Sequence, residues 1–149
     1  MGILCPVERQ SIEILLKSFE TLDFENACIL INEIGQLYDF TREIPEIAWD
    51  IVEFENNALV IEYPHFNENV RKILPNGFKP RIMLVKEHPL YKSLHSFGKG
   101  LIFLYHLNPE IIDQNLPSLE YVLNLNSSAF DLFNPKVIQL KMNGEIKFL

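Results

Sequence analysis

Histidine and carboxylate side chains are the groups in this sequence that could bind a metal ion or transfer a proton. None of the histidines forms an H-x-H or H-x-x-x-H pair, and neither cysteine lies close to one, so the sequence predicts no metal site and no cofactor. The carboxylate pairs Glu43/Glu46 and Glu53/Glu55 are interpreted as solvated acids. The histidines are His65, His88, His95 and His106.

The sequence also lacks the common nucleophile and phosphate motifs, because it contains no G-x-S-x-G, no P-loop and no G-x-G-x-x-G. The stretch Gly98-Lys99-Gly100 is without the third glycine and the following helix that phosphate binding uses. No catalytic residue is therefore predicted. An enzyme that uses His88 or His95 stays one hypothesis, although no nucleophile or orienting acid can be named for it.

The charge is distributed by segment. Residues 1–70 carry 14 acidic and 3 basic side chains, whereas residues 71–99 carry 7 basic side chains and the single acid Glu87. If the fold gathers these bases on one side, they form a positive patch for an acidic protein partner, and otherwise they pair with the acidic N-terminal third. The predicted partner-binding residues are Lys79, Arg81, Lys86, His88, Lys92 and Lys99.

Length and composition restrict the class of protein. The chain has 149 residues, 48% of them hydrophobic, with a net charge of −7, which is typical of one globular domain spanning residues 1–149 and excludes disorder. A sequence pI near 5.1 argues against nucleic acid, and no apolar run is long enough to cross a bilayer. Without a leader pattern, and with only Cys5 and Cys28, we expect a soluble cytoplasmic protein with idle or buried thiols.

Hydrophobic periodicity predicts a helical N-terminal region. Apolar residues at helical spacing predict a helix over residues 7–21. A second helix is favoured over residues 24–38, although 27–31 alone could be a buried strand. Residues 49–63 then alternate with a period of two, which predicts a hairpin turning at Asn56-Asn57 and pairing Phe54 with Leu59.

The second half of the chain predicts mostly strands. The apolar runs 82–85 and 101–107 are expected to be central strands, and residues 118–131 a late helix. Residues 137–149 form a hairpin whose three-residue loop, with Gly144 in the left-handed region, pairs Leu140 with Ile146 and Ile138 with Phe148. The predicted fold is α+β, an N-terminal helical region and an antiparallel sheet of about six strands with the late helix packed on it.

The order of several short motifs resembles the central part of ubiquitin-conjugating enzymes. These motifs are Leu59 to Pro64, Phe78 to Leu84, His88-Pro89 and Gly98 to Leu104. The resemblance implies a variant without the catalytic cysteine, because Phe103 stands at the nucleophile position and Leu90 replaces the asparagine of the His-Pro-Asn motif. It would therefore imply a non-catalytic module that binds a ubiquitin-like protein or assists an active partner.

Two protein-binding hypotheses follow. In the first, the basic segment of such a non-catalytic interaction module contacts a ubiquitin-like or other acidic partner. In the second, the chain is a small acidic immunity or inhibitor protein that covers a basic toxin such as a nuclease. The acidic surface of this second hypothesis consists of Glu43, Glu46, Asp50, Glu53 and Glu55. Oligomeric state cannot be read from these residues.

Overall fold

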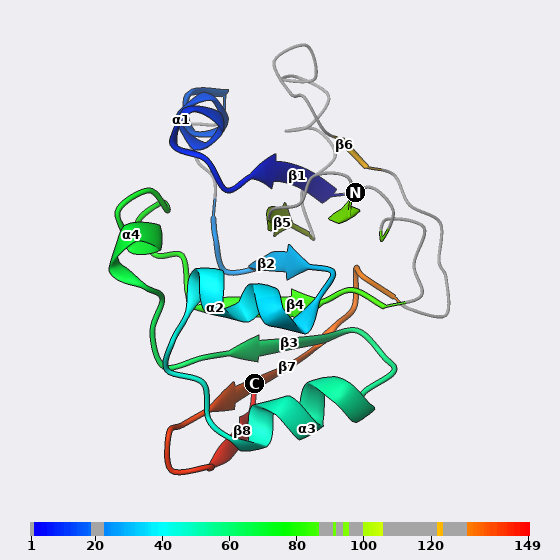
Figure 1. Cartoon of the computed structure of the whole chain (residues 1–149). Helices are drawn as coiled ribbons and strands as arrows, with labels where there is room; N and C mark the ends of the chain where they lie inside the picture. Colours follow the sequence, from blue (N-terminus) through cyan, green and yellow to red (C-terminus); the bar gives the residue numbers. More distant parts are fainter. Residues whose placement is uncertain are drawn as a thin grey trace.

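The computed structural model describes residues 2–18, 23–86, 91, 94–95, 100–105, 122–123 and 131–149. These residues form a mixed eight-stranded sheet in the order β6-β1-β5-β2-β4-β3-β7-β8 (Figure 1). The strands are β1 (Gly2–Pro6), β2 (Ala27–Ile31), β3 (Leu59–Glu62), β4 (Arg81–Leu84), β5 (Leu101–Leu104), β6 (Val122–Leu123), β7 (Lys136–Leu140) and β8 (Ile146–Phe148). The helices are α1 (Arg9–Ser18), the 3₁₀ turn η1 (Ile34–Gln36), α2 (Leu37–Phe40), α3 (Ile47–Phe54) and α4 (Glu68–Arg71).

The α+β class is confirmed, but the sheet is not the antiparallel one that was predicted. Strand β2 pairs with β4 in parallel, and β3 pairs with β7 in parallel, while the other pairings are antiparallel. A parallel pair needs a long crossover connection. Residues 32–80 and 63–135 provide these crossovers, and neither can be recognised from local sequence.

Two elements of the first half were predicted wrongly. Residues 27–31 form β2 and not part of a helix, because all five side chains are buried on the two faces of a central strand. Residues 47–54 form α3 and not a hairpin arm, because Ala48 and Val52, one helical turn apart, pack together against the sheet. The predicted pairing of Phe54 with Leu59 is therefore absent, and Phe54 is 74% exposed at the end of α3.

The prediction of a late helix over residues 118–131 is wrong at residues 122 and 123. Val122 and Leu123 form β6, which pairs with Gly2 and Ile3 of β1, so these residues are extended. The remainder of the predicted helix, except for Asp131, lies outside the described residues. Pairing with β1, which is distant in the sequence, outweighs the helical pattern of these two residues.

Other sequence predictions are confirmed. Helix α1 falls inside residues 7–21, the apolar run at 82–85 overlaps the central strand β4, and the run at 101–107 contains the central strand β5. The C-terminal hairpin has the predicted register, with Leu140 opposite Ile146 and Ile138 opposite Phe148. Gly144 has a φ of 89°, the left-handed conformation that its loop requires.

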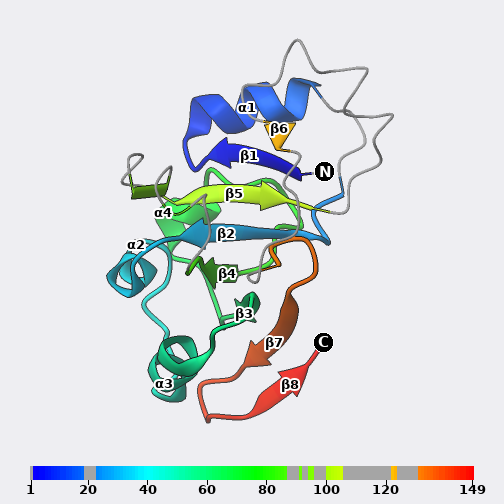
Figure 2. The same cartoon turned by 90° about the vertical axis from the view of Figure 1, so that its right-hand side faces the viewer.

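The sheet buries side chains on both faces. The four α-helices cover one face of the sheet (Figure 2). They contribute Ile12, Leu37, Val52 and Val70 to the hydrophobic core on that side. The other face contains Leu30, Val60, Met83 and Phe103, which pack with Leu94 and Leu132. We call the first the helix face and the second, which the four α-helices do not cover, the open face. In the described part of the chain, no helix is long and apolar enough to cross a bilayer.

Candidate functional site: a groove at the carboxyl ends of β3 and β7

The predicted basic patch is divided between the two faces of the sheet. Side chains alternate along β4, so Arg81 lies on the open face with Met83 and Val85, whereas Lys86 follows Ile82 and Leu84 onto the helix face. Lys79, two residues before Arg81, is exposed beside the same end of the sheet as Arg81. The other predicted residues of the patch, His88, Lys92 and Lys99, lie outside the described residues.

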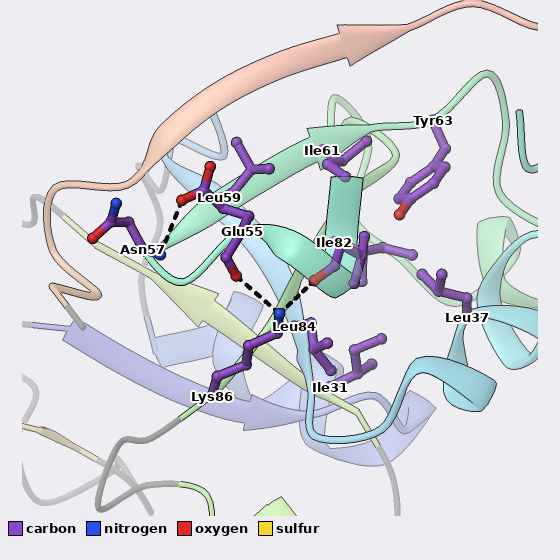
Figure 3. Close-up of a pocket in the computed structure, with 11 residues that line it drawn as sticks. Ile31, Leu37, Glu55, Asn57, Leu59, Ile61, Tyr63, Ile82, Leu84 and Lys86 are labelled. Carbon is purple, nitrogen blue, oxygen red and sulfur yellow. Dashed lines mark hydrogen bonds between the residues drawn. The ribbon is translucent and has the colours of Figure 1, made fainter. Parts of the chain in front are cut away.

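Lys86 has a structural partner. Its ammonium donates hydrogen bonds to the main-chain oxygens of Val52, Glu53 and Glu55, at 2.9 Å for Glu53 and 2.8 Å for Glu55. Figure 3 shows the bond to Glu55. Val52 and Glu53 belong to the last turn of α3 and Glu55 is its C-cap residue. At this end of a helix the carbonyls lack helical partners and the helix dipole favours a cation. All three donors of the ammonium are used, so Lys86 has none left for a ligand.

The cavity next to Lys86 is too small for a substrate. Its volume is about 20 Å³, enough for one water-sized sphere, and its walls are mainly apolar side chains such as Ile31, Leu37 and Ile61 (Figure 3). The small volume and the occupied ammonium indicate that this cavity is part of the packing between α3 and the sheet.

Replacing Lys86 with Met should reduce stability without affecting any ligand site. The side chain keeps its length, but three carbonyl oxygens at the end of α3 lose their donor, which should cost about 2 kcal/mol. Urea unfolding measures this loss, and the exposed Lys79→Met variant is the matched control with an expected change below about 0.5 kcal/mol. Equal stabilities of the two variants would contradict the capping role.

A row of hydrogen-bonded polar side chains crosses the open face. The Nε of Arg81 lies 3.0 Å from Oε1 of Glu62, and Gln139 donates from Nε2 to Oε2 of Glu62 at 2.7 Å. Arg81 also donates from a terminal nitrogen to the carbonyl oxygen of Glu25 at 2.9 Å. Both charged side chains are about nine-tenths buried, with 10% and 11% exposed. The row therefore joins β4, β3 and β7 through a rigid and satisfied network.

A groove of about 350 Å³ lies at one end of this row. It follows the carboxyl ends of the parallel strands β3 and β7, which meet at one edge because they run in the same direction. Lys79 and Lys141 line it, and Glu62 and Gln139 contribute polar atoms from the row. Lys141 also forms an exposed ion pair with Glu145 at 3.3 Å, a contact that solvent screens strongly.

The electrostatics of the groove favour an anion. The carboxylate of Glu62 is neutralised by Arg81, and the lysines add two further positive charges on flexible side chains. With Glu145 counted against Lys141, one positive charge remains uncompensated. An anionic ligand bound here could bridge Lys79 and Lys141.

The buried thiol and phenol groups of the open face do not suit nucleophilic chemistry. Burial raises the pKa of the Cys28 thiol far above its ordinary value, with a smaller opposing effect from Arg81. Burial also raises the pKa of Tyr105 to about 12, with Cys28 adding to the rise. Both groups are therefore protonated near neutral pH. Cys5 and Cys28 are buried and are not joined by a disulfide bond, as the sequence predicted.

Neither of the described histidines, His65 and His95, lines the groove. His65 approaches Glu43 at 3.6 Å on an exposed surface. His95 lies 3.3 Å from the amide of Asn32 and 3.9 Å from Glu33, and Tyr91 stacks on its ring. His88 and His106 lie outside the described residues. Across the described ranges, no group of three or more histidine, cysteine and carboxylate side chains could hold a metal ion.

The acidic surface of the immunity hypothesis lies on α3 and its flanks, not on a hairpin. Asp50 and Glu53 are exposed on α3, Glu43 and Glu46 are exposed before it, and Glu55 ends it. This surface is on the helix side of the sheet, whereas the groove lies at the carboxyl ends of β3 and β7.

Comparisons with known proteins give a fold but no family. No protein-family model and no curated protein matches the chain. Among solved structures, a double variant of Sua5 from P. abyssi matches with a TM-score of 0.60 and 14% identity, over 93% of this chain and 45% of that one. YciO from E. coli matches with a TM-score of 0.59 and 14% identity, over 93% of this chain and 72% of that one. The fold is that of Sua5 and YciO.

A third match extends this fold to part of a larger protein. Full-length HypF, solved in a phosphate- and nucleotide-bound form, matches with a TM-score of 0.61 and 8% identity. The match covers 99% of this chain and 24% of HypF. The chain thus spans a quarter of HypF and less than half of Sua5.

The resemblance to ubiquitin-conjugating enzymes is wrong. Strands β3 and β4 are adjacent, but β2 separates β4 from β5, so the motifs at 78–84 and 98–104 do not form neighbouring strands. Phe103 is a fully buried core residue that packs with Tyr105 and Phe133. The non-catalytic ubiquitin-type module and the immunity protein are overturned together, because the matching structures are Sua5, YciO and HypF.

Sequence reasoning identified Lys79 and Arg81 but missed Glu62, Gln139 and Lys141. The sequence signal that could have found two of them is the alternation of side chains along the C-terminal strand, which places Gln139 and Lys141 on one face. Their proximity to Lys79 depends on the parallel pairing of β3 with β7, which joins residues 77 apart in the sequence. Nothing local in the sequence indicates that pairing.

Proposed function

We propose that this chain is a binding domain for a phosphate-bearing small molecule, with a nucleotide as the favoured class. The observation that carries the proposal is the pair Lys79 and Lys141 in a groove whose carboxylate, Glu62, is already neutralised by Arg81. Lysine binds phosphate as a mobile point charge, and two lysines on one groove can contact separate phosphoryl oxygens.

The fold supports this choice of ligand. HypF, which shares it, has been solved with phosphate and nucleotide bound. Ligands of open sheets commonly bind at the carboxyl ends of parallel strands, and the groove is at such an end. A groove of about 350 Å³ is within the size range of small-molecule sites.

The individual side chains have separate roles in this proposal. Lys79 and Lys141 contact the phosphoryl oxygens, and Gln139 donates an amide hydrogen bond to Glu62, which fixes the base of the groove. Arg81 is a positioning residue, because its guanidinium is engaged with Glu62 and the carbonyl of Glu25. We assign no catalytic residue. A cytoplasmic location is part of the proposal, since Cys5 and Cys28 are not joined by a disulfide bond.

The test is isothermal titration calorimetry with ATP, and separately with inorganic phosphate. Each of Lys79→Glu and Lys141→Glu should weaken ATP binding about tenfold, and the double variant about a hundredfold. Lys136→Glu is the matched control, because Lys136 is exposed at the opposite end of β7 and carries the same charge.

The salt dependence provides a second readout. Binding through exposed lysines should weaken as ionic strength rises, because their charges are screened. Absence of ATP and phosphate binding by the wild-type chain, or equal weakening by Lys136→Glu and Lys79→Glu, would overturn the proposal. Phosphate binding without added affinity for ATP would retain the anion groove and reject the nucleotide.

A further inference from the structure

Strand β8 forms one edge of the sheet that the described residues make (Figure 2). It carries exposed apolar side chains. Ile146 is 40% exposed, Phe148 is 82% exposed and Leu149 is 54% exposed. Ile146 and Phe148 lie opposite Leu140 and Ile138, so they extend the helix face of the sheet beyond its buried part. Apolar residues on an unpaired edge favour addition of another strand.

The hydrogen bonds of the hairpin show which main-chain groups of β8 are directed outward. Lys141 donates its N–H to Glu145 at 3.0 Å, and Leu149 donates its N–H to Val137 at 3.0 Å. In an antiparallel pair, hydrogen-bonded residues alternate with residues whose polar groups are directed away from the partner. The N–H and C=O of Ile146 and Phe148 are therefore directed away from β7.

Charge selects one register for a second copy of this strand. A two-fold axis at Ile146 sets each Glu145 opposite Lys147 of the second copy, and pairs the outward main-chain groups of the two Ile146 residues. An axis at Lys147 would instead place two lysines opposite each other. The first register also places Phe148 opposite Gly144 of the second copy, where a ring can cover the glycine backbone.

We propose that two copies of this chain form an isologous dimer by antiparallel pairing of their β8 strands, centred on Ile146. This pairing would continue the sheet across the two-fold axis and bury both Ile146 side chains. The dimer shares one residue with the proposed phosphate site, because Glu145 also forms the ion pair with Lys141. Ile146, Lys147 and Phe148 do not line the groove, so Lys147→Glu and Ile146→Pro test the dimer without changing the groove.

The test measures the dimer dissociation constant of the full chain by sedimentation equilibrium. Lys147→Glu and Glu145→Lys each place like charges opposite one another twice, which should weaken the dimer about tenfold. The double variant Glu145→Lys/Lys147→Glu restores both pairs with reversed sign, and should return the dissociation constant to near the wild-type value.

A proline variant tests the hydrogen bonds. Because the N–H of Ile146 is directed away from β7, Ile146→Pro removes an intermolecular donor and leaves the ladder between β7 and β8 intact. It should weaken the dimer at least tenfold. Circular dichroism checks that the variants stay folded. A wild-type chain that is monomeric at every soluble concentration, or charge variants that dimerise as the wild type does, would overturn the proposal.

Discussion

Replacing Glu62 with Leu is expected to lower the free energy of unfolding by about 3 to 5 kcal/mol. The change leaves the guanidinium of Arg81 buried without its carboxylate, with only 10% of its side chain exposed. It also removes the oxygen that accepts a hydrogen bond from Gln139. Urea denaturation at neutral pH measures the loss.

The double variant Glu62→Leu/Arg81→Met should be markedly more stable than Glu62→Leu alone. An apolar pair of similar volume removes the uncompensated charge, and buried ion pairs often contribute little net stability compared with such a pair. The coupling between the two positions in a double-mutant cycle should be about 2 kcal/mol or more.

An exposed ion pair provides the control for this cycle. Lys72 and Glu68 lie 3.7 Å apart, with 66% and 75% of their side chains exposed. Their coupling should be no more than about 0.5 kcal/mol. If the coupling of Arg81 with Glu62 were as small, the network would not be the rigid base of the groove.

The second large effect is expected at Gly100, immediately before β5. A Cβ at this position would lie 2.5 Å from Cζ of Phe40 and 2.9 Å from Cγ2 of Ile29. Gly100→Ala should therefore displace the ring of Phe40 from its position between α2 and the sheet, at a cost of about 3 kcal/mol. Thermal unfolding should show a clearly lower midpoint than the wild type.

Two further variants test this close approach. Gly35→Ala is the control, because a Cβ at Gly35 in η1 meets nothing within 4 Å, and its stability should equal or exceed that of the wild type. Phe40→Leu shortens the opposing side chain, so it should be less destabilising in the Gly100→Ala background than in the wild type. Additive effects of the two substitutions would show that the ring is not what the new methyl group meets.

The sequence alone determined the elements whose signals are local. The C-terminal hairpin was predicted to the residue, because the backbone of Gly144 and the alternation of Ile138 and Leu140 admit one aligned register. The buried strands β4 and β5 were recognisable from continuous apolar runs. Helix α1 was recognisable from its period.

Only the tertiary structure decided the remaining elements. The pattern of residues 24–38 favoured a helix, with a strand over 27–31 as the alternative, and these residues become β2 because β4 and β5 pair with both of its edges. Residues 47–54 carry a pattern compatible with a hairpin, and become α3 because Ala48 and Val52 pack on the sheet. Propensity is weaker than such non-local pairing and packing.

The candidate site was also determined partly by local sequence and partly by the tertiary structure. The clustering of basic residues between positions 71 and 99 indicated Lys79 and Arg81. It also indicated Lys86, whose ammonium instead caps the end of α3. The groove exists because β3 and β7 run in parallel, which brings Glu62 beside Gln139. Residue types and the local hydrophobic period can be read from the sequence. The residues that become neighbours across a parallel strand pair depend on the path of the whole chain.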